Sequence, residues 1–184
     1  MKKIAIAILI AAGAQLASAD GLKSLESFMK GSQTGRADFT QVVTSPPKDG
    51  QVARTKTSSG TFEFQRPGRF KFVYKKPFEQ TIVADGQTLW LYDTDLSALK
   101  ADFTLEAAPD QDGLQWVLAR PKTKDGQLQS VRVGFAGEQL AALDILDSFG
   151  QRSAIRFTGM QANAALPPAT FQFKPPQGAD VVKQ

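Results

Sequence analysis

Apolar residues along this chain follow two different spacings, which divide the sequence into a helical start and a long β-rich remainder. Four apolar residues near the start recur at helical spacing: Leu22, Leu25, Phe28 and Met29. This spacing predicts a short amphipathic helix that ends near Gly31. From Arg36 onward apolar and polar residues alternate, as they do in strands that bury one face. The chain is therefore predicted to be mainly β, with one N-terminal helix.

Turn residues interrupt the alternating part of the chain at short intervals. Asp85-Gly86 lies between two alternating runs and is a strong hairpin signal. Strands are expected near 36–42, 57–66, 68–75, 79–84, 87–93, 102–108, 114–120, 127–135, 139–147, 152–159 and 170–173. About ten or eleven short, evenly spaced strands are typical of an antiparallel sheet curled into an open barrel.

The most informative stretch runs from Gly60 to Tyr74, where aromatic residues repeat at every second position. Five aromatic side chains are predicted to share one face of two successive strands: Phe62, Phe64, Phe70, Phe72 and Tyr74. Arg69 and Lys71 project to the opposite face. The sheet therefore has one aromatic surface that must be covered or filled, and one largely cationic surface.

Composition excludes most catalytic chemistry. The 184 residues include no histidine and no cysteine, so Ser-His and Cys-His pairs, and a zinc site, are not expected. No glycine-rich phosphate loop occurs, and no cofactor is predicted. A hydrolase that uses paired carboxylates, for example Asp93 and Asp95, remains an alternative, although turn residues of this kind usually face solvent.

Residues 1–19 have the features of a secretory signal peptide. Lys2 and Lys3 precede an apolar segment over 4–14, and Ala17-Ser18-Ala19 forms a small-residue cleavage site. Cleavage before Asp20 would leave residues 20–184 as one exported domain without a cysteine for lipid attachment. Loss of two lysines from 22 Lys+Arg leaves 20 against 18 Asp+Glu, a net charge of +2, which is too small to indicate nucleic-acid binding.

Several short motifs, in this order, resemble those of the LolA family of periplasmic outer-membrane lipoprotein carriers. They are Phe39-Thr40-Gln41; Arg66-Pro67 followed by Phe70 and Phe72; Asp85-Gly86 followed by Leu89-Trp90 and Tyr92; Asp147-Ser148-Phe149-Gly150-Gln151; and Phe171, Phe173, Pro175-Pro176, Gly178 and Asp180-Val181. The resemblance covers nearly all of residues 20–184.

The resemblance implies a half-open antiparallel β-barrel closed by a helical lid. It also implies a monomeric chaperone that accepts acylated lipoproteins from an inner-membrane ABC transporter and delivers them to the outer-membrane receptor LolB. The missing cysteine at the cleavage site favours the carrier over the receptor. In such a carrier, Arg66 would hold the lid closed. The aromatic residues expected to contact lipid are Phe62, Phe64, Phe70, Phe72, Trp90, Tyr92 and Trp116.

The match departs from the family in the middle of the chain. Tyr92-Asp93-Thr94-Asp95 runs almost directly into 97–103, where the family has a further strand and lid helices, so a shortened lid is expected. A carrier of another lipid, such as a glycolipid or a fatty-acyl product, is therefore the main alternative. The carboxylate hydrolase is the second.

Overall fold

The residues that the structure describes form one curled antiparallel sheet and two short helices, because alternating apolar side chains give each strand one face to bury. The structure is a computed structural model that describes residues 20–47, 50–85, 96–123 and 126–172. Nine strands pair in the order β4-β3-β2-β1-β9-β8-β7-β6-β5. Their bounds are β1 Thr34–Ser45, β2 Arg54–Gln65, β3 Arg69–Lys76, β4 Gln80–Asp85, β5 Phe103–Gln111, β6 Leu114–Pro121, β7 Leu128–Ala136, β8 Gln139–Asp147 and β9 Arg152–Ala162.

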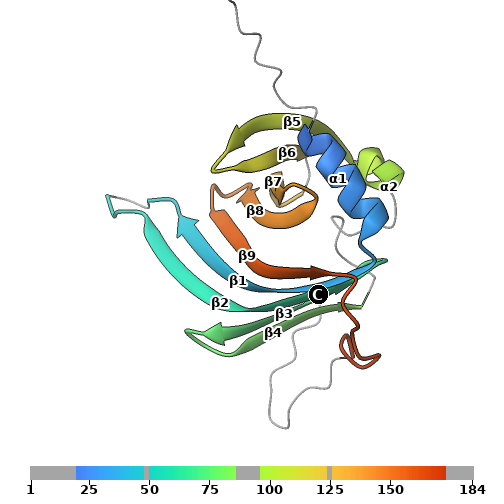
Figure 1. Ribbon diagram of the computed structural model, residues 1–184. Coiled ribbons are helices and arrows are strands. Elements are labelled where there is room, and N and C mark those ends of the chain that lie inside the picture. The colour runs from blue at the N-terminus through green and yellow to red at the C-terminus, as the bar shows by residue number, and fades with distance from the viewer. Residues whose placement is uncertain (1–19, 48–49, 86–95, 124–125, 173–184) are drawn as a thin grey trace, which may run out of the picture.

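The last strand among the described residues, β9, lies in the middle of the sheet. β9 pairs with the first strand, β1, over Gly35↔Ala162 to Thr44↔Arg152, and with β8 on its other side. The sheet curls so that β5–β8 arch over the concave face of β1–β4 and β9 (Figure 1). Among the described residues, β4 and β5 are its two ends and do not pair with each other. The result is an open barrel rather than a closed one.

Two helices cover one side of the curl. α1 (Asp20–Gly31) packs against β5, β6, β7 and β8, and α2 (Leu96–Asp102) lies beside β5 (Figure 1). α1 ends where the Ser32 N–H donates to the Phe28 carbonyl oxygen at 3.0 Å. In the part of the chain that the structure describes, no helix is long and apolar enough to cross a membrane.

The main core fills the space between α1 and the concave face of the sheet. Phe62, Phe64 and Phe135 are fully buried there. They belong to one cluster with the α1 residues Leu25 and Phe28. Because residues two apart share a face of a strand, the alternating pattern of the sequence places these side chains on the inner face.

The structure matches the predicted architecture and corrects two of its details. Thr170–Phe173 is not a strand over its described part: residues 168–171 form a turn in which the Thr170 N–H donates to the Pro167 carbonyl. A helix, α2, occupies 96–102, where no element was predicted. The expected strand at 87–93 lies outside the described residues.

Candidate functional site

An aromatic cluster forms the centre of the concave face. The Phe62 ring lies 4.6 Å from Phe72 and 5.0 Å from Phe157, measured between ring centroids. Phe28, from α1, lies 5.7 Å from Phe64 and 5.9 Å from Phe135. Tilted and edge-on rings at these separations give aromatic pairs additional attraction beyond their buried area. The helix and the strands therefore share one apolar contact surface.

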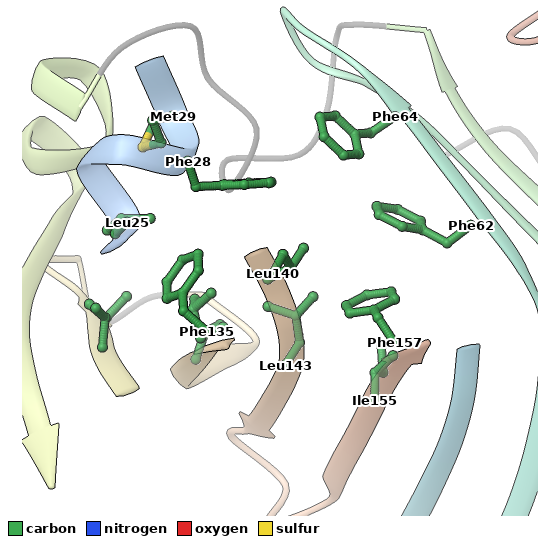
Figure 2. Close-up of a cluster of buried hydrophobic side chains, with 14 of the residues drawn as sticks. Leu25, Phe28, Met29, Phe62, Phe64, Phe135, Leu140, Leu143, Ile155 and Phe157 are labelled. Carbon is green, nitrogen blue, oxygen red and sulfur yellow. The ribbon is translucent and has the colours of Figure 1, made fainter. Parts of the chain in front are cut away.

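The side chain of Phe64 is accommodated by a glycine on the neighbouring strand. Gly35 pairs with Phe64 across β1 and β2. A Cβ at position 35 would lie 2.3 Å from the Phe64 ring, so only glycine leaves room for it. Figure 2 shows Phe62 and Phe64 projecting from β2 toward the side of the interior where Phe28 lies. This close approach directs the ring of Phe64 toward α1.

The interior is nearly full in this structure. A cavity of about 20 Å³, roughly the space of one water molecule, lies between the two helices and strands β5–β8. Leu25, Phe28 and Met29 line it from α1, and Leu99 lines it from α2 (Figure 2 labels the first three). Among the described lining residues, only Arg66 is charged. An acyl chain can enter only if α1 moves or the sheet opens.

Arg66 joins β2 to the end of α1. Its side chain is 7% exposed, and its Nε donates to the carbonyl oxygen of Ser32 at 2.8 Å. Its guanidinium also lies 5.1 Å from the Phe28 ring centroid and 5.8 Å from that of Phe64. A guanidinium is always charged and carries several donors, so it can bond a backbone carbonyl while it stacks on rings. Arg66 thus links the end of α1, the helix that covers the interior, to the aromatic cluster.

A second polar residue holds the same junction and was not identified from the sequence. Asn163 follows β9, and its Nδ2 donates to the Gly31 carbonyl at 2.8 Å while its Oδ1 accepts from the Gln33 N–H at 2.9 Å. Its backbone has a φ of 54°, in the left-handed region that asparagine tolerates better than most residues. The turn at 163 was predictable, but a contact with residues about 130 positions earlier was not.

The aromatic residues predicted to contact lipid divide into three groups. Phe62, Phe64, Phe70 and Phe72 lie together on the inner face, with Phe72 only half-buried. Trp90 and Tyr92 lie outside the described residues. Trp116 is not part of this cluster.

Trp116 projects from β6 to the outer face of the sheet. Its neighbours Val117 and Ala119 point inward and line the small cavity, which directs Trp116 outward. The residue is 1% exposed: it packs with Ala108 and Ala142, and the guanidinium carbons of Arg132 and Arg156 lie 4.5 and 5.5 Å from its ring centroid. Its Nε1 donates to the Gln111 carbonyl. Trp116 therefore stabilises the outer surface of β6–β9 and does not contact the interior.

The described site lacks the converging carboxylates that hydrolysis requires. The cavity lining contains no aspartate or glutamate. No group of three or more acidic, histidine or cysteine residues within the described ranges is placed to hold a metal ion. The two aspartates of the hydrolase alternative, Asp93 and Asp95, lie outside those ranges.

The fold and the site define a half-open β-barrel whose apolar interior is covered by a helix. Comparisons with known proteins identify the family more narrowly. The family model "Outer membrane lipoprotein carrier protein LolA" matches residues 30–101 and 96–174. This chain belongs to that family, whose members are periplasmic carrier proteins and not enzymes.

Relatives match over nearly their whole length. An outer-membrane lipoprotein carrier protein of Albidiferax ferrireducens is 64% identical over 207 aligned positions, covering 96% of this chain and 97% of that protein. One from Methylibium petroleiphilum is 48% identical, covering 97% and 96%. Among solved structures, the crystal structure of MucB has a TM-score of 0.48 at 14% identity, covering 83% of this chain and 61% of that chain, too distant to support a functional argument.

The comparisons also bear on the middle of the chain. The alignment with the Albidiferax protein has 207 positions, more than the 184 residues here, so that relative carries residues without a counterpart in this chain. The two parts of the family match overlap at 96–101, which includes most of α2. A shortened middle segment is therefore consistent with both findings.

Proposed function

We propose that residues 20–184 form a periplasmic chaperone that carries acylated lipoproteins to the outer membrane. The proposal rests chiefly on one observation: a helix held by a few polar contacts covers an aromatic interior, in a chain of the lipoprotein carrier family. Residues 1–19 would direct export and be removed as a signal peptide. The mature protein would act as a monomer and bind its cargo one to one.

The physical task explains why the interior must be apolar. Exposing an acyl chain to water costs roughly 0.8 kcal/mol per methylene group, so a lipoprotein with several chains cannot cross an aqueous compartment alone. Phe62, Phe64, Phe70 and Phe72 supply broad apolar surfaces that fit flexible chains. Trp90 and Tyr92 stay in the proposed lipid-contacting set on the resemblance alone.

On loading, the acyl chains of the cargo would replace the apolar side chains of α1 inside the barrel. In the empty protein, Leu25, Phe28 and Met29 of α1 occupy the interior. Acyl chains would displace them, and Arg66 and Asn163 would release the end of α1. On handover α1 would return to the sheet, so the closing contacts favour release of cargo. Arg66 is therefore proposed to close the cover rather than to bind lipid.

The partners follow from the route that such a cargo takes. An inner-membrane ABC transporter would supply the lipoprotein, and the outer-membrane receptor LolB would accept it. Transfer from the transporter to the carrier and then to LolB needs no energy source in the periplasm if each protein binds the acyl chains more tightly than the protein that delivers them.

A carrier of another lipid is the second candidate. The observation that favours it is that the Albidiferax protein carries residues without a counterpart in this chain. A smaller cover would suit a cargo with fewer or shorter chains.

A release assay tests the proposal. Spheroplasts that contain a labelled outer-membrane lipoprotein are incubated with purified residues 20–184. Recovery of a soluble one-to-one complex is the expected result. Failure of a well-folded sample to release any lipoprotein, together with binding of free fatty acid or glycolipid, would replace the proposal with the second candidate.

A further inference from the structure

A groove of about 140 Å³ opens on the concave face, beyond the aromatic cluster. We call it the Lys56 groove. Residues from β1, β2, β3, the β3–β4 turn and β4 line it; those that matter here are Gln41, Lys56, Ser58, Tyr74, Phe78 and Gln80. It is distinct from the small cavity beneath α1, with which it shares no lining residue.

The Lys56 groove continues the aromatic surface. Tyr74 lines the groove, and its ring lies 6.3 Å from Phe72 and 5.0 Å from Phe39. Phe72 in turn packs against Phe62, at a tilt of 35°, at the centre of the cluster. A ligand that lies along this line would pass from fully buried rings to a half-open polar groove without leaving the inner face.

Two of the polar side chains that line the groove, Tyr74 and Gln41, are held in fixed positions by hydrogen bonds. The Tyr74 hydroxyl donates to Gln41 Oε1 at 2.9 Å, and Gln41 Nε2 donates to Ser153 Oγ at 2.6 Å. Lys56 Nζ lies 5.8 Å from the centroid of the exposed Phe78 ring. No carboxylate lines the groove, and no salt bridge joins Lys56 to a carboxylate in the described ranges. Because the Tyr74 proton is donated to Gln41, the groove offers the Lys56 ammonium and the Ser58 hydroxyl as donors to an acceptor-rich ligand.

We propose that the Lys56 groove binds the polar root of the cargo, where ester and amide carbonyls join the acyl chains to a glyceryl-cysteine terminus. The inference rests on the proposed carrier function and assigns it a second subsite. The acyl chains lie along the aromatic surface, and the carbonyl oxygens accept hydrogen bonds from Lys56 and Ser58. The polypeptide of the cargo then leaves through the open side of the groove.

The size of the groove agrees with a polar root rather than a whole ligand. Pockets that enclose a drug-sized molecule measure about 300–1,000 Å³. At about 140 Å³ the Lys56 groove has room for a glyceryl group and its carbonyls, while the chains need the larger space opened by α1. A single cation also suits carbonyl oxygens or one anionic group better than a multiply charged head.

Binding measurements on head-group analogues test this subsite. Purified residues 20–184 are titrated with a dipalmitoyl-glycerylcysteine peptide, with its dialkyl-ether analogue, which lacks the ester carbonyls, and with palmitate. The test variant is Lys56→Gln, and the matched control is Lys71→Gln on the outer face of β3. Tyr74→Phe serves as a second variant that leaves the ring in place.

The wild type is expected to bind the ester peptide about tenfold more tightly than the ether analogue, because hydrogen bonds from a charged donor are strong. Lys56→Gln should abolish this preference, and Lys71→Gln should retain it. Equal discrimination by wild type and Lys56→Gln would overturn the subsite and leave carriage intact. If Lys56→Gln weakened the binding of palmitate alone, the groove would be a site for a free carboxylate, and its assignment to the glyceryl esters would be overturned. Binding of neither peptide by the wild type would overturn the carrier function itself.

Discussion

Arg66 Nε donates a hydrogen bond of 2.8 Å to the carbonyl oxygen of Ser32. Arg66 directly follows β2 and Ser32 directly follows α1, so this bond ties the end of the strand to the end of the helix. The contact joins positions 34 residues apart in sequence. The cation is buried against Phe28, which cargo would displace, and against Phe64, which cargo would contact. A closing contact of this kind is sensitive to the occupancy of the interior, because moving either ring alters the position of the guanidinium.

Replacing Arg66 with leucine should impair delivery while leaving folding and lipid uptake intact. Leucine preserves apolar packing but cannot bond the Ser32 carbonyl. A hydrogen bond from a charged donor contributes about 1.5–3 kcal/mol, so the balance between closed and loaded forms should shift about 10- to 100-fold toward the loaded form. The measurement is the rate of lipoprotein transfer from the purified complex to membranes that contain the receptor. Arg69→Leu, on the exposed side of β3, is the control, and a normal transfer rate for Arg66→Leu would refute the closing role.

Removing the Asn163 side chain should loosen the same end of α1. Asn163→Gly keeps the left-handed backbone accessible and removes two hydrogen bonds to the helix junction. The expected loss is about 1–3 kcal/mol of unfolding free energy, with faster amide hydrogen exchange in α1. Asp112→Gly, at a φ of 56° in the β5–β6 turn, is the matched control. Equal exchange rates in α1 for the two variants would show that Asn163 does not hold the helix.

The fold was predictable from the sequence because its strands bury one face each. Alternation placed Phe62, Phe64, Phe70 and Phe72 on one surface, and the structure agrees. Around Trp116 the sequence gives no such guidance, since residues 116–119 are apolar on both faces. In the structure Val117 and Ala119 form the inner face of β6. The arginines that cover Trp116 on the outer face come from β7 and β9.

The contacts that hold the helices on the sheet were harder to predict from the sequence. α2 has seven residues, too few for a periodic pattern to stand out from the flanking strands. The role of Arg66 came from family resemblance, and its bond to Ser32 depends on how α1 docks. Asn163 acts across the chain on Gly31 and Gln33, a contact that no local motif encodes.

The start of α1 should tolerate no added side chain on its sheet-facing side. A Cβ at Gly21 would lie 2.6 Å from the backbone oxygen of Trp116, so Gly21→Ala must push α1 away from β6. We expect a loss of about 1–3 kcal/mol from overpacking and increased binding of a hydrophobic dye. At Gly31 nothing lies within 4 Å of an added Cβ, so Gly31→Ala should gain up to about 1 kcal/mol from helix propensity. A melting temperature of Gly21→Ala equal to or above that of the wild type would contradict the close approach at Gly21.

Burial at the Lys56 groove should make the stability of the protein depend on alkaline pH. Burial raises the pKa of the Tyr74 phenol above its ordinary value of about 10. Between that ordinary value and the raised one, the unfolded chain has lost the Tyr74 proton while the folded chain retains it. The folded state then binds more protons than the unfolded state, so the free energy of unfolding falls as the pH rises above about 10.

Tyr74→Phe isolates this effect, because the only other tyrosine, Tyr92, is present in both proteins. Urea unfolding at pH 8 and at pH 10.5 should show a larger loss of stability for the wild type than for the variant. Absorbance of tyrosinate should show the same difference, with the Tyr74 contribution appearing above pH 10. An equal decline in the two proteins would mean that Tyr74 is solvated in solution, and that the inner wall of the Lys56 groove is more open than the ring contacts with Phe39 and Phe72 indicate.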